Sequence, residues 1–293
     1  MNLKDIHIRD PFILTDGDTY YLYGSRGDEA WGICTGLDVY KSKDLKEWSA
    51  PIEVFTRPEN FWSDKNYWAP EVHKYNGAYY MLASFFSDTR QRGTQILKSD
   101  SPEGPFLPYS DGPVTPADWS CLDGTLYIEN DIPYMIFCHE WVQVNDGEMC
   151  AVQLSDDLKR SVGEPFLLFK ASQLQGVISP CIPPSKIRST NENCFVTDGP
   201  YMYKTDGGRL IMLWSSFTKD GYCEAISYSD NGSIRGNWYH DERKLFKKDG
   251  GHGMIFRDFN GNLRFTLHNP NESPLERPAI LYLEEKNDSL YVK

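Results

Sequence analysis

The chain has 293 residues, of which 40% are hydrophobic and 14% aromatic, and these fractions suit a globular protein with a large core. Its 42 acidic residues outnumber its 30 basic residues, which gives a formal net charge of −12. Nucleic acids and anionic membranes bind clustered Lys and Arg, so this charge argues against both kinds of partner. Nowhere does the sequence approach the roughly 20 consecutive apolar residues that a membrane helix needs.

The first residues lack the basic and apolar segments of a secretory signal, so the sequence as given predicts a cytoplasmic protein. A periplasmic or secreted location would follow if a signal peptide had been trimmed.

Seven cysteines lie at scattered positions without a CxxC pair. This spacing argues against a zinc site and favours buried free thiols.

The stretch from Ile8 to Ser25 is typical of a β-hairpin, because Asp16-Gly17-Asp18 separates two apolar runs. A third strand is expected at Leu37–Ser42, and a turn signal follows at Ser42–Trp48. This unit, from Asp10 to about Ser49, recurs. Further hairpins are expected at Ala69–Ser84, Leu122–Phe137, Thr197–Ser216 and Gly251–His268, and their third strands at Thr94–Ser99, Met149–Ser155, Cys223–Ser229 and Pro278–Leu283.

The five copies lie at intervals of roughly 50 to 80 residues, and none contains an amphipathic helix. Repeats of this kind predict an all-β, five-bladed β-propeller that spans residues 1–293 as a single domain. Between the third and fourth copies lies the longest non-repeating stretch, Lys170–Asn193. We expect a helical turn over Lys170–Gln175 and a loop beyond it, because Pro180, Pro183 and Pro184 fit neither a helix nor a central strand.

The innermost strand of each propeller blade lines the central channel, so residues at one place in every repeat converge. Alignment of the copies puts five ionisable residues at or near that place: Asp10, Glu71, Asp123, Asp198 and His252. Carboxyl groups crowded together raise at least one pKa while others stay ionised, which is the division of labour between the acid and the base of a glycosidase. An Asp beside Gly or Pro is often only a turn residue, but recurrence over several blades weighs against that interpretation.

With these residues assembled, the chain resembles the family 43 glycoside hydrolases, five-bladed propellers that release or cleave arabinose, xylose or related sugars. The resemblance rests on five motifs in order, Arg9-Asp10-Pro11-Phe12-Ile13, Trp68-Ala69-Pro70-Glu71, Leu122-Asp123-Gly124-Thr125-Leu126, Asp198-Gly199-Pro200-Tyr201 and Gly250-Gly251-His252-Gly253. It implies that Asp10 is the general base, that Asp123 orients the acid and tunes its pKa, and that Asp198 stands where the family has its general-acid Glu. His268 and Arg277 are similar to the closing His and the inward Arg of blade five.

The Asp at position 198 departs from the family pattern, because Asp is one methylene shorter than Glu. A misplacement of about 1 Å can cost ~100-fold in rate, so either the backbone moves inward or another carboxyl acts. Glu140 and Glu224 are the alternative acids. Loss of hydrolysis would leave a non-catalytic carbohydrate-binding propeller, and a protein-interaction propeller is disfavoured because such repeats need no inner-strand acids.

The resemblance implies an inverting glycosidase, with roughly 6.5 to 9.5 Å between acid and base. An α-L-arabinofuranosidase is the first choice, and a β-D-galactofuranosidase, an endo-arabinanase or a β-xylosidase are the alternatives. The sugar could be contacted by Trp68, Glu71, Trp119, Glu140, Trp141, Glu224, His252 and Arg277. No cofactor is required, although a structural calcium ion could lie near His252, mostly coordinated by water because calcium takes about 6 to 8 oxygen ligands.

Overall fold

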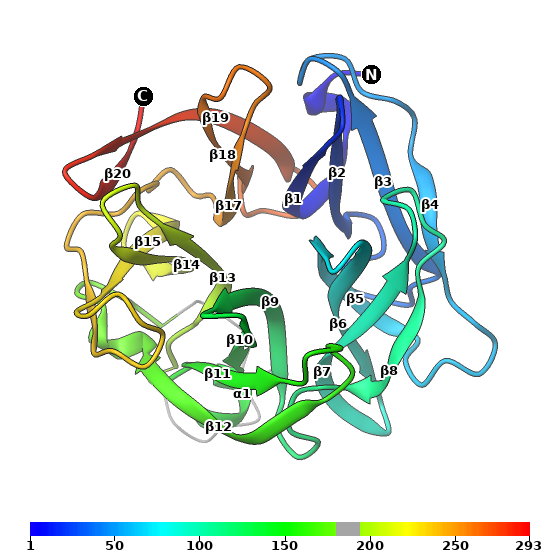
Figure 1. Ribbon diagram of the computed structural model, residues 1–293, viewed down its shortest axis with the longest axis horizontal. Coiled ribbons are helices and arrows are strands. Elements are labelled where there is room, and N and C mark those ends of the chain that lie inside the picture. The colour runs from blue at the N-terminus through cyan, green and yellow to red at the C-terminus, as the bar shows by residue number, and fades with distance from the viewer. Residues whose placement is uncertain (180–193) are drawn as a thin grey trace.

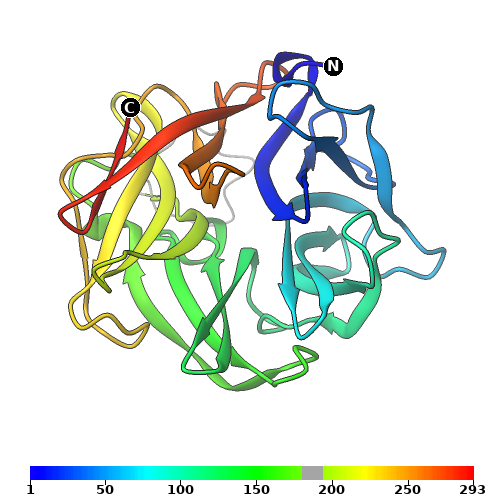
Figure 2. The same ribbon diagram turned by 45° about the horizontal axis from the view of Figure 1, so that its top comes forward.

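The computed structural model describes residues 1–179 and 194–293. These residues form five four-stranded antiparallel sheets, arranged as blades around a central channel (Figures 1 and 2). The five-bladed propeller predicted from the repeats is therefore confirmed. Cys181 and the three prolines of the predicted loop lie outside the described residues. No helix in the described ranges is long and apolar enough to cross a membrane.

Strand order within every blade follows the chain from the channel to the rim. The first two blades are β1 (Ile8–Asp16), β2 (Thr19–Arg26), β3 (Gly36–Ser42) and β4 (Ile52–Thr56), then β5 (Lys65–Tyr75), β6 (Ala78–Ser87), β7 (Arg90–Ser99) and β8 (Leu107–Pro113). Blade three is β9 (Cys121–Glu129), β10 (Ile132–His139), β11 (Glu148–Leu154) and β12 (Ser161–Lys170). The last two are β13 (Asp198–Lys204), β14 (Leu210–Thr218), β15 (Gly221–Ser229) and β16 (Trp238–His240), then β17 (Gly251–Arg257), β18 (Leu263–Asn269), β19 (Arg277–Lys286) and β20 (Ser289–Val292).

In residues 1–179 and 194–293, helical structure is confined to short turns. These are the 3-10 helix η1 (Leu3–Asp5), the single α-helical turn α1 (Trp141–Val144) and the 3-10 helix η2 (Ala171–Gln173), which lies within the helical turn predicted after Lys170.

The core lies between the blades, where large side chains of the second strands are fully buried: Tyr23, Phe85, Phe137, Trp214 and Phe265. Burial of each Phe contributes on the order of 1.5 to 3 kcal/mol to stability. The six described cysteines are free and buried, as the sequence predicts.

The first and last blades meet without exchanging a strand (Figure 1). Side chains close the ring instead. The Arg9 guanidinium pairs with the buried carboxylate of Glu276 at 2.6 Å, and Arg277 Nε donates to the Lys4 carbonyl at 3.0 Å. The Phe259 N–H donates to the Tyr20 hydroxyl at 2.7 Å.

Replacing Glu276 by Gln is expected to lower the free energy of unfolding by about 3 kcal/mol. The substitution removes the carboxylate of a buried ion pair and leaves the positive charge of Arg9 without its partner. Urea unfolding followed by tryptophan fluorescence measures this loss. The matched control is Glu284→Gln, which removes a solvent-exposed partner of Lys293 and should cost less than about 1 kcal/mol. Equal losses in the two variants would contradict the closing role of the Arg9–Glu276 pair.

A β-bulge interrupts the innermost strand of every blade at the same place, so that two of its residues face one residue of the second strand. The first bulge residue has a positive φ in each blade: Asp10 (54°), Ala69 (47°), Asp123 (56°), Gly199 (50°) and His252 (52°). Residues other than Gly rarely adopt this conformation, and it clusters at functional sites. The bulges therefore define the positions that are equivalent by the fold.

The sequence alignment is correct for Asp10, Asp123 and His252, which are first bulge residues. The other two members lie near this position but not at it. In blade two the position belongs to Ala69, with Glu71 two residues later, and in blade four it belongs to Gly199, with Asp198 one residue earlier. The reason is that the bulge is a backbone feature, which Ala and Gly can occupy as well as an ionisable residue.

Candidate active site

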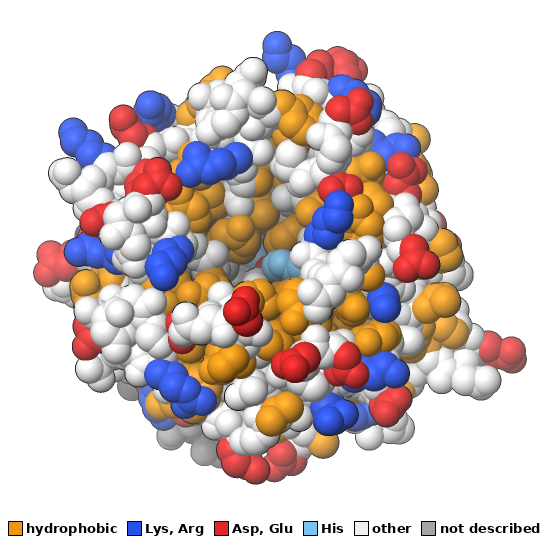
Figure 3. All heavy atoms as spheres, viewed as in Figure 1, with side chains coloured by type: hydrophobic (Ala, Val, Ile, Leu, Met, Phe, Trp, Pro, Cys, Tyr) orange, Lys and Arg blue, Asp and Glu red, His pale blue; other side chains and the backbone are white. Residues whose placement is uncertain are grey.

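A pocket of about 600 Å³ lies where the innermost strands begin, and all five blades contribute to its wall. Its lining includes Trp31, Trp68, Arg92, Glu140, Trp141, Phe217, Tyr222 and Glu276, with Asp10, Asp123, Asp198 and His252 among them. The channel also opens on the opposite face, where a second cavity of about 620 Å³ is lined by residues such as Phe12, Tyr201 and Met254. Figure 3 shows a central hollow ringed by hydrophobic side chains.

Asp10 is buried and highly connected. Ser25 Oγ donates to its Oδ2 at 2.5 Å, and Nδ1 of His252 lies 3.1 Å from its Oδ1. Burial alone would raise the pKa of Asp10, but the charges of His252 and Arg9 outweigh burial and hold that pKa well below its usual range. The carboxylate is therefore ionised at neutral pH, as a general base must be.

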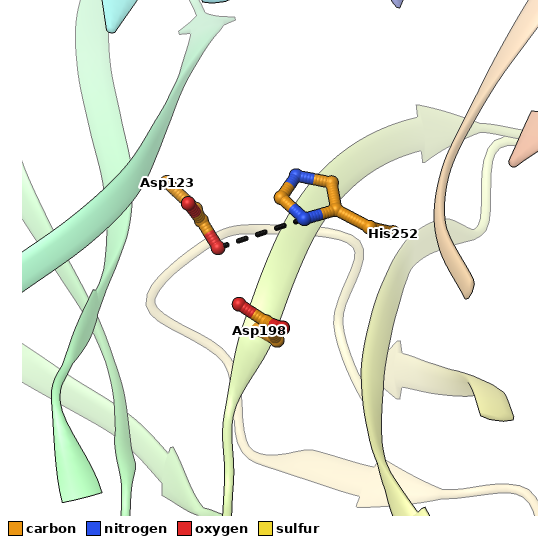
Figure 4. A group of neighbouring side chains, drawn as sticks. All are labelled: Asp123, Asp198 and His252. Carbon is orange, nitrogen blue, oxygen red and sulfur yellow. Dashed lines mark ion pairs between the residues drawn. The ribbon is translucent and has the colours of Figure 1, made fainter. Parts of the chain in front are cut away.

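His252 lies between two carboxyl groups, with Nδ1 3.7 Å from Asp123 Oδ2 (Figure 4). Burial would lower the pKa of its imidazole, but Asp10 above all raises it, to about 9. His252 is thus an imidazolium at neutral pH. His268 behaves oppositely: burial and the charge of Arg9 lower its pKa to about 3, and its Nδ1 accepts the Asp10 N–H at 3.2 Å.

Asp123 and Asp198 form a pair of neighbouring carboxyl groups (Figure 4). Burial first, and then the charge of Asp123, raise the pKa of Asp198 well above its usual value. Burial also raises the pKa of Asp123, to about 6, although Asp198 donates a hydrogen bond to it. Two carboxyl groups that interact this strongly share a proton, and Asp198 is the member that holds it. The pocket thus contains an ionised carboxylate and a protonated carboxylic acid.

An ionised carboxylate beside a protonated carboxylic acid is the pairing that a glycosidase uses. A comparison with protein families agrees, because the glycosyl hydrolases family 43 matches residues 4–283 of this chain. The chain belongs to this family. It is therefore a glycoside hydrolase. An endo-arabinase from Bacteroides thetaiotaomicron VPI-5482 has a similar structure, with a TM-score of 0.88, 38% sequence identity and coverage of 98% of both chains.

Two curated relatives match shorter stretches. The extracellular endo-alpha-(1->5)-L-arabinanase 1 of Bacillus subtilis is 34% identical over 106 residues, which are 33% of this chain and 32% of that protein. The extracellular exo-alpha-(1->5)-L-arabinofuranosidase ArbA of Cellvibrio japonicus is 25% identical over 175 residues, 54% of this chain and 46% of that protein. The matches thus span about a third to a half of the curated relatives.

Two features position the Asp198 carboxyl group in this family 43 hydrolase. The Tyr222 hydroxyl, from β15, donates to Asp198 Oδ2 at 2.5 Å and fixes the carboxyl group. Gly199 permits a close approach, because a Cβ there would lie 2.6 Å from the His252 ring. The sequence motifs did not reveal Tyr222, since it lies on a third strand; only the register of β15 with β14 places it beside the pocket.

The aromatic wall of the hydrolase differs from the expectation in one respect. The guanidinium of Arg92 lies 3.8 Å from the ring centroid of Trp68, and thus covers one face of this ring. Trp31, which the sequence did not single out, meets Trp68 edge-on at 5.3 Å and is 58% exposed. Trp31 therefore offers a more open surface for stacking on sugar than Trp68 does.

Glu140 and Trp141 line the pocket as predicted candidates for sugar contacts. Ser120 Oγ donates to Glu140 Oε2 at 2.6 Å, and Arg92 Nε donates to the same oxygen at 3.3 Å. Glu140 therefore already serves as the partner of a cation. This distinguishes it from Asp198, whose partner is another carboxyl group.

The structure does not bring the remaining predicted contacts to the pocket wall. Trp119 stacks on His139 with ring centroids 4.2 Å apart, and Arg277 lies at the ring closure. Glu71 binds His73 at 2.9 Å and lines a small cavity deeper in the channel with His252. Glu224 is completely buried.

Asp123, Asp198 and His252 could hold a metal ion, because their potential ligand atoms all lie within 4.8 Å of one another. The set fits calcium poorly. It offers two carboxylates where calcium takes about 6 to 8 oxygens, and the His252 nitrogen nearest to them already pairs with Asp10.

Treatment with EDTA is accordingly expected to change kcat/KM by less than about twofold, because protein groups already hold the carboxyl oxygens. Rates measured after dialysis against EDTA, and again after addition of calcium, check this. A loss of activity that calcium restores would contradict the expectation and identify a bound ion.

Replacing Asp123 by Asn is expected to move the alkaline limb of the pH profile of kcat/KM to lower pH. The charge of Asp123 and its hydrogen bond to Asp198 both raise the pKa of Asp198, so their loss lets that acid give up its proton at a lower pH. The acidic limb, which Asp10 controls, should shift less. An alkaline limb that stays in place would contradict the assignment of Asp123.

Proposed function

We propose that the chain is an inverting hydrolase of α-L-arabinofuranosyl linkages in arabinan-type substrates. The observation that carries this proposal is the pairing, in one pocket, of an ionised Asp10 with a protonated Asp198. Full-length similarity to a structure described as an endo-arabinase supports the choice of substrate.

In this mechanism Asp198 donates its proton to the glycosidic oxygen as the bond to the anomeric carbon breaks. A water molecule attacks that carbon from the opposite face and gives a proton to Asp10. Asp123 and Tyr222 orient the acid, and His252 keeps Asp10 ionised. Single displacement inverts the anomeric configuration, so an α-linkage yields a β-product.

Cleavage within the arabinan chain is the first candidate, because the structure similar over its full length and the Bacillus subtilis relative are both described as acting in the endo mode. Release of single arabinose units is the second. It is favoured by a pocket wall to which every blade contributes and by the exo-acting relative.

Linear α-1,5-arabinan distinguishes these modes. Endo cleavage should lower viscosity early, before many reducing ends form, and should release oligosaccharides; exo cleavage should release arabinose while viscosity persists. Nitrophenyl β-D-galactofuranoside and β-D-xylopyranoside serve as controls for the other substrates. Hydrolysis of either control in preference to arabinan and nitrophenyl α-L-arabinofuranoside would contradict the proposal.

A further inference from the structure

The second residue of each bulge differs between the blades in whether it has a backbone N–H to satisfy. In blades one, two and four this residue is Pro11, Pro70 or Pro200, which has no N–H. In blades three and five it is Gly124 or Gly253. A buried backbone N–H needs an acceptor, so only these two bulges require one here.

The neighbouring blade supplies an acceptor in those two cases. The Gly124 N–H donates to Thr94 Oγ1 at 3.1 Å, and the Gly253 N–H donates to Glu224 Oε2 at 3.1 Å. Thr94 and Glu224 hold the same position, since each lies on a third strand opposite a Ser of the second strand. Where the next bulge contains Pro, the corresponding residue is apolar: Leu37, Met149 and Pro278.

Glu224 accepts one more hydrogen bond at this position than the Thr94 hydroxyl does. Its Oε2 also accepts a hydrogen bond from Ser215 Oγ at 2.8 Å, and that hydroxyl accepts the His252 N–H at 2.7 Å. One carboxyl oxygen therefore holds both N–H groups of the His252-Gly253 bulge, the second directly and the first through Ser215.

The carboxyl group is costly to keep there. Glu224 is 0% exposed, and its Oε1 has no hydrogen-bond partner among the described residues. Burial raises its pKa to about 8. An unsatisfied buried oxygen is destabilising, and the hydroxyl of a Thr would satisfy Gly253 as Thr94 satisfies Gly124. Glu224 does not line the pocket, so contact with the substrate does not explain it.

We propose that Glu224 is a positioning residue, which fixes the His252-Gly253 bulge and thereby holds the His252 imidazole against Asp10 and Asp123. The backbone of His252 has a positive φ, a conformation that persists only when its surroundings enforce it. Glu224, through Ser215 and Gly253, provides that enforcement from the neighbouring blade.

The readout follows from the titratable groups that face His252. They are Asp10 on β1, Glu71 on β5, Asp123 on β9, Asp198 on β13, Glu224 on β15 and His268 on β18. The shortest side-chain contact is with Asp10, whose pKa the imidazolium lowers. A misplaced His252 lets the pKa of Asp10 rise toward its ordinary value, so the acidic limb of kcat/KM moves to higher pH.

The test compares Glu224→Leu, which removes the acceptor, with Glu224→Gln, which keeps one, in pH profiles on the best arabinofuranosyl substrate. Glu224→Leu should lower kcat by roughly 10- to 100-fold with little change in KM and should move the acidic limb to higher pH. Glu224→Gln should have the kcat and the acidic limb of the wild type. Ser227→Ala is the matched control: Ser227 is also buried on β15, and it accepts the Trp214 indole N–H at 2.7 Å away from the pocket.

A second measurement needs no turnover, and it separates this inference from the proposed substrate. NMR of ¹⁵N-labelled His252 should show an imidazole that titrates at lower pH in Glu224→Leu than in the wild type and Glu224→Gln. If Glu224→Leu does not fold, Glu224→Thr supplies the acceptor for Gly253 alone and should give an intermediate shift. The proposal would be overturned if Glu224→Leu kept both the acidic limb and the His252 titration of the wild type. It would also be overturned if Glu224→Gln failed to restore these two properties.

Discussion

Replacing Asp198 by Asn is expected to lower kcat/KM on arabino-oligosaccharides by roughly 10²- to 10⁴-fold, the usual contribution of a general acid. A sugar alkoxide leaves poorly without a proton, and Asn has none to give. The amide fits the same space and can still accept the hydrogen bond from Tyr222, so the loss should lie in kcat rather than in folding. Initial rates on arabinotriose measure it.

The leaving group distinguishes loss of the acid from general damage to the pocket. A 2,4-dinitrophenolate departs without protonation, so the effect of Asp198→Asn on its α-L-arabinofuranoside should be much smaller than the effect on arabinotriose. Glu140→Gln is the matched control, because Glu140 lines the pocket and is the alternative acid that the sequence suggested there. If Glu140→Gln shows this dependence on the leaving group and Asp198→Asn does not, the acid is Glu140.

Replacing Asp10 by Asn is expected to lower kcat/KM by roughly 10²- to 10⁴-fold for every leaving group, because the attacking water must lose its proton whatever departs. Asn can still accept the hydrogen bond from Ser25, so the pocket should keep its shape. Parallel assays of arabinotriose and the dinitrophenyl glycoside measure the effect on both classes of leaving group.

Asp16→Asn is the control for this second prediction. Asp16 lies at the far end of the same strand, where it binds Lys74 and Tyr79 outside the pocket, and its replacement should leave the rates unchanged. A large recovery of Asp10→Asn on the dinitrophenyl substrate alone would contradict the role of Asp10 as base and would indicate that it assists the leaving group.

The sequence predicts the propeller because each blade carries its own local signals. The hairpin at Asp16-Gly17-Asp18 and its four counterparts are set by turn chemistry and by apolar runs, which are visible without tertiary contacts. The bulges are not visible in this way. A bulge adds one residue to one strand, and the apolar pattern is the same with Ala69 or Glu71 in the first bulge position.

The site was predictable where it follows the inner strands and not where it depends on neighbouring blades. Asp10, Asp123 and Asp198 belong to motifs at the start of those strands, and the structure brings them to one pocket. Tyr222 reaches Asp198 from the third strand of blade four, and Glu224 on the same strand binds the bulge of blade five instead of lining the pocket as a candidate acid; the register of that strand decides both. Trp119 shows the reverse error, since an aromatic residue near a motif can pack against a neighbouring ring instead.

The stereochemistry of the first product tests the central claim most directly. Proton NMR of arabinotriose hydrolysis at early times, before mutarotation, resolves the anomeric protons of the new reducing end. Single displacement by water activated at Asp10 predicts that the β-anomer appears first and the α-anomer grows in later. Initial formation of the α-anomer would contradict this account, because retention requires a covalent intermediate on a carboxylate rather than a water molecule between base and sugar.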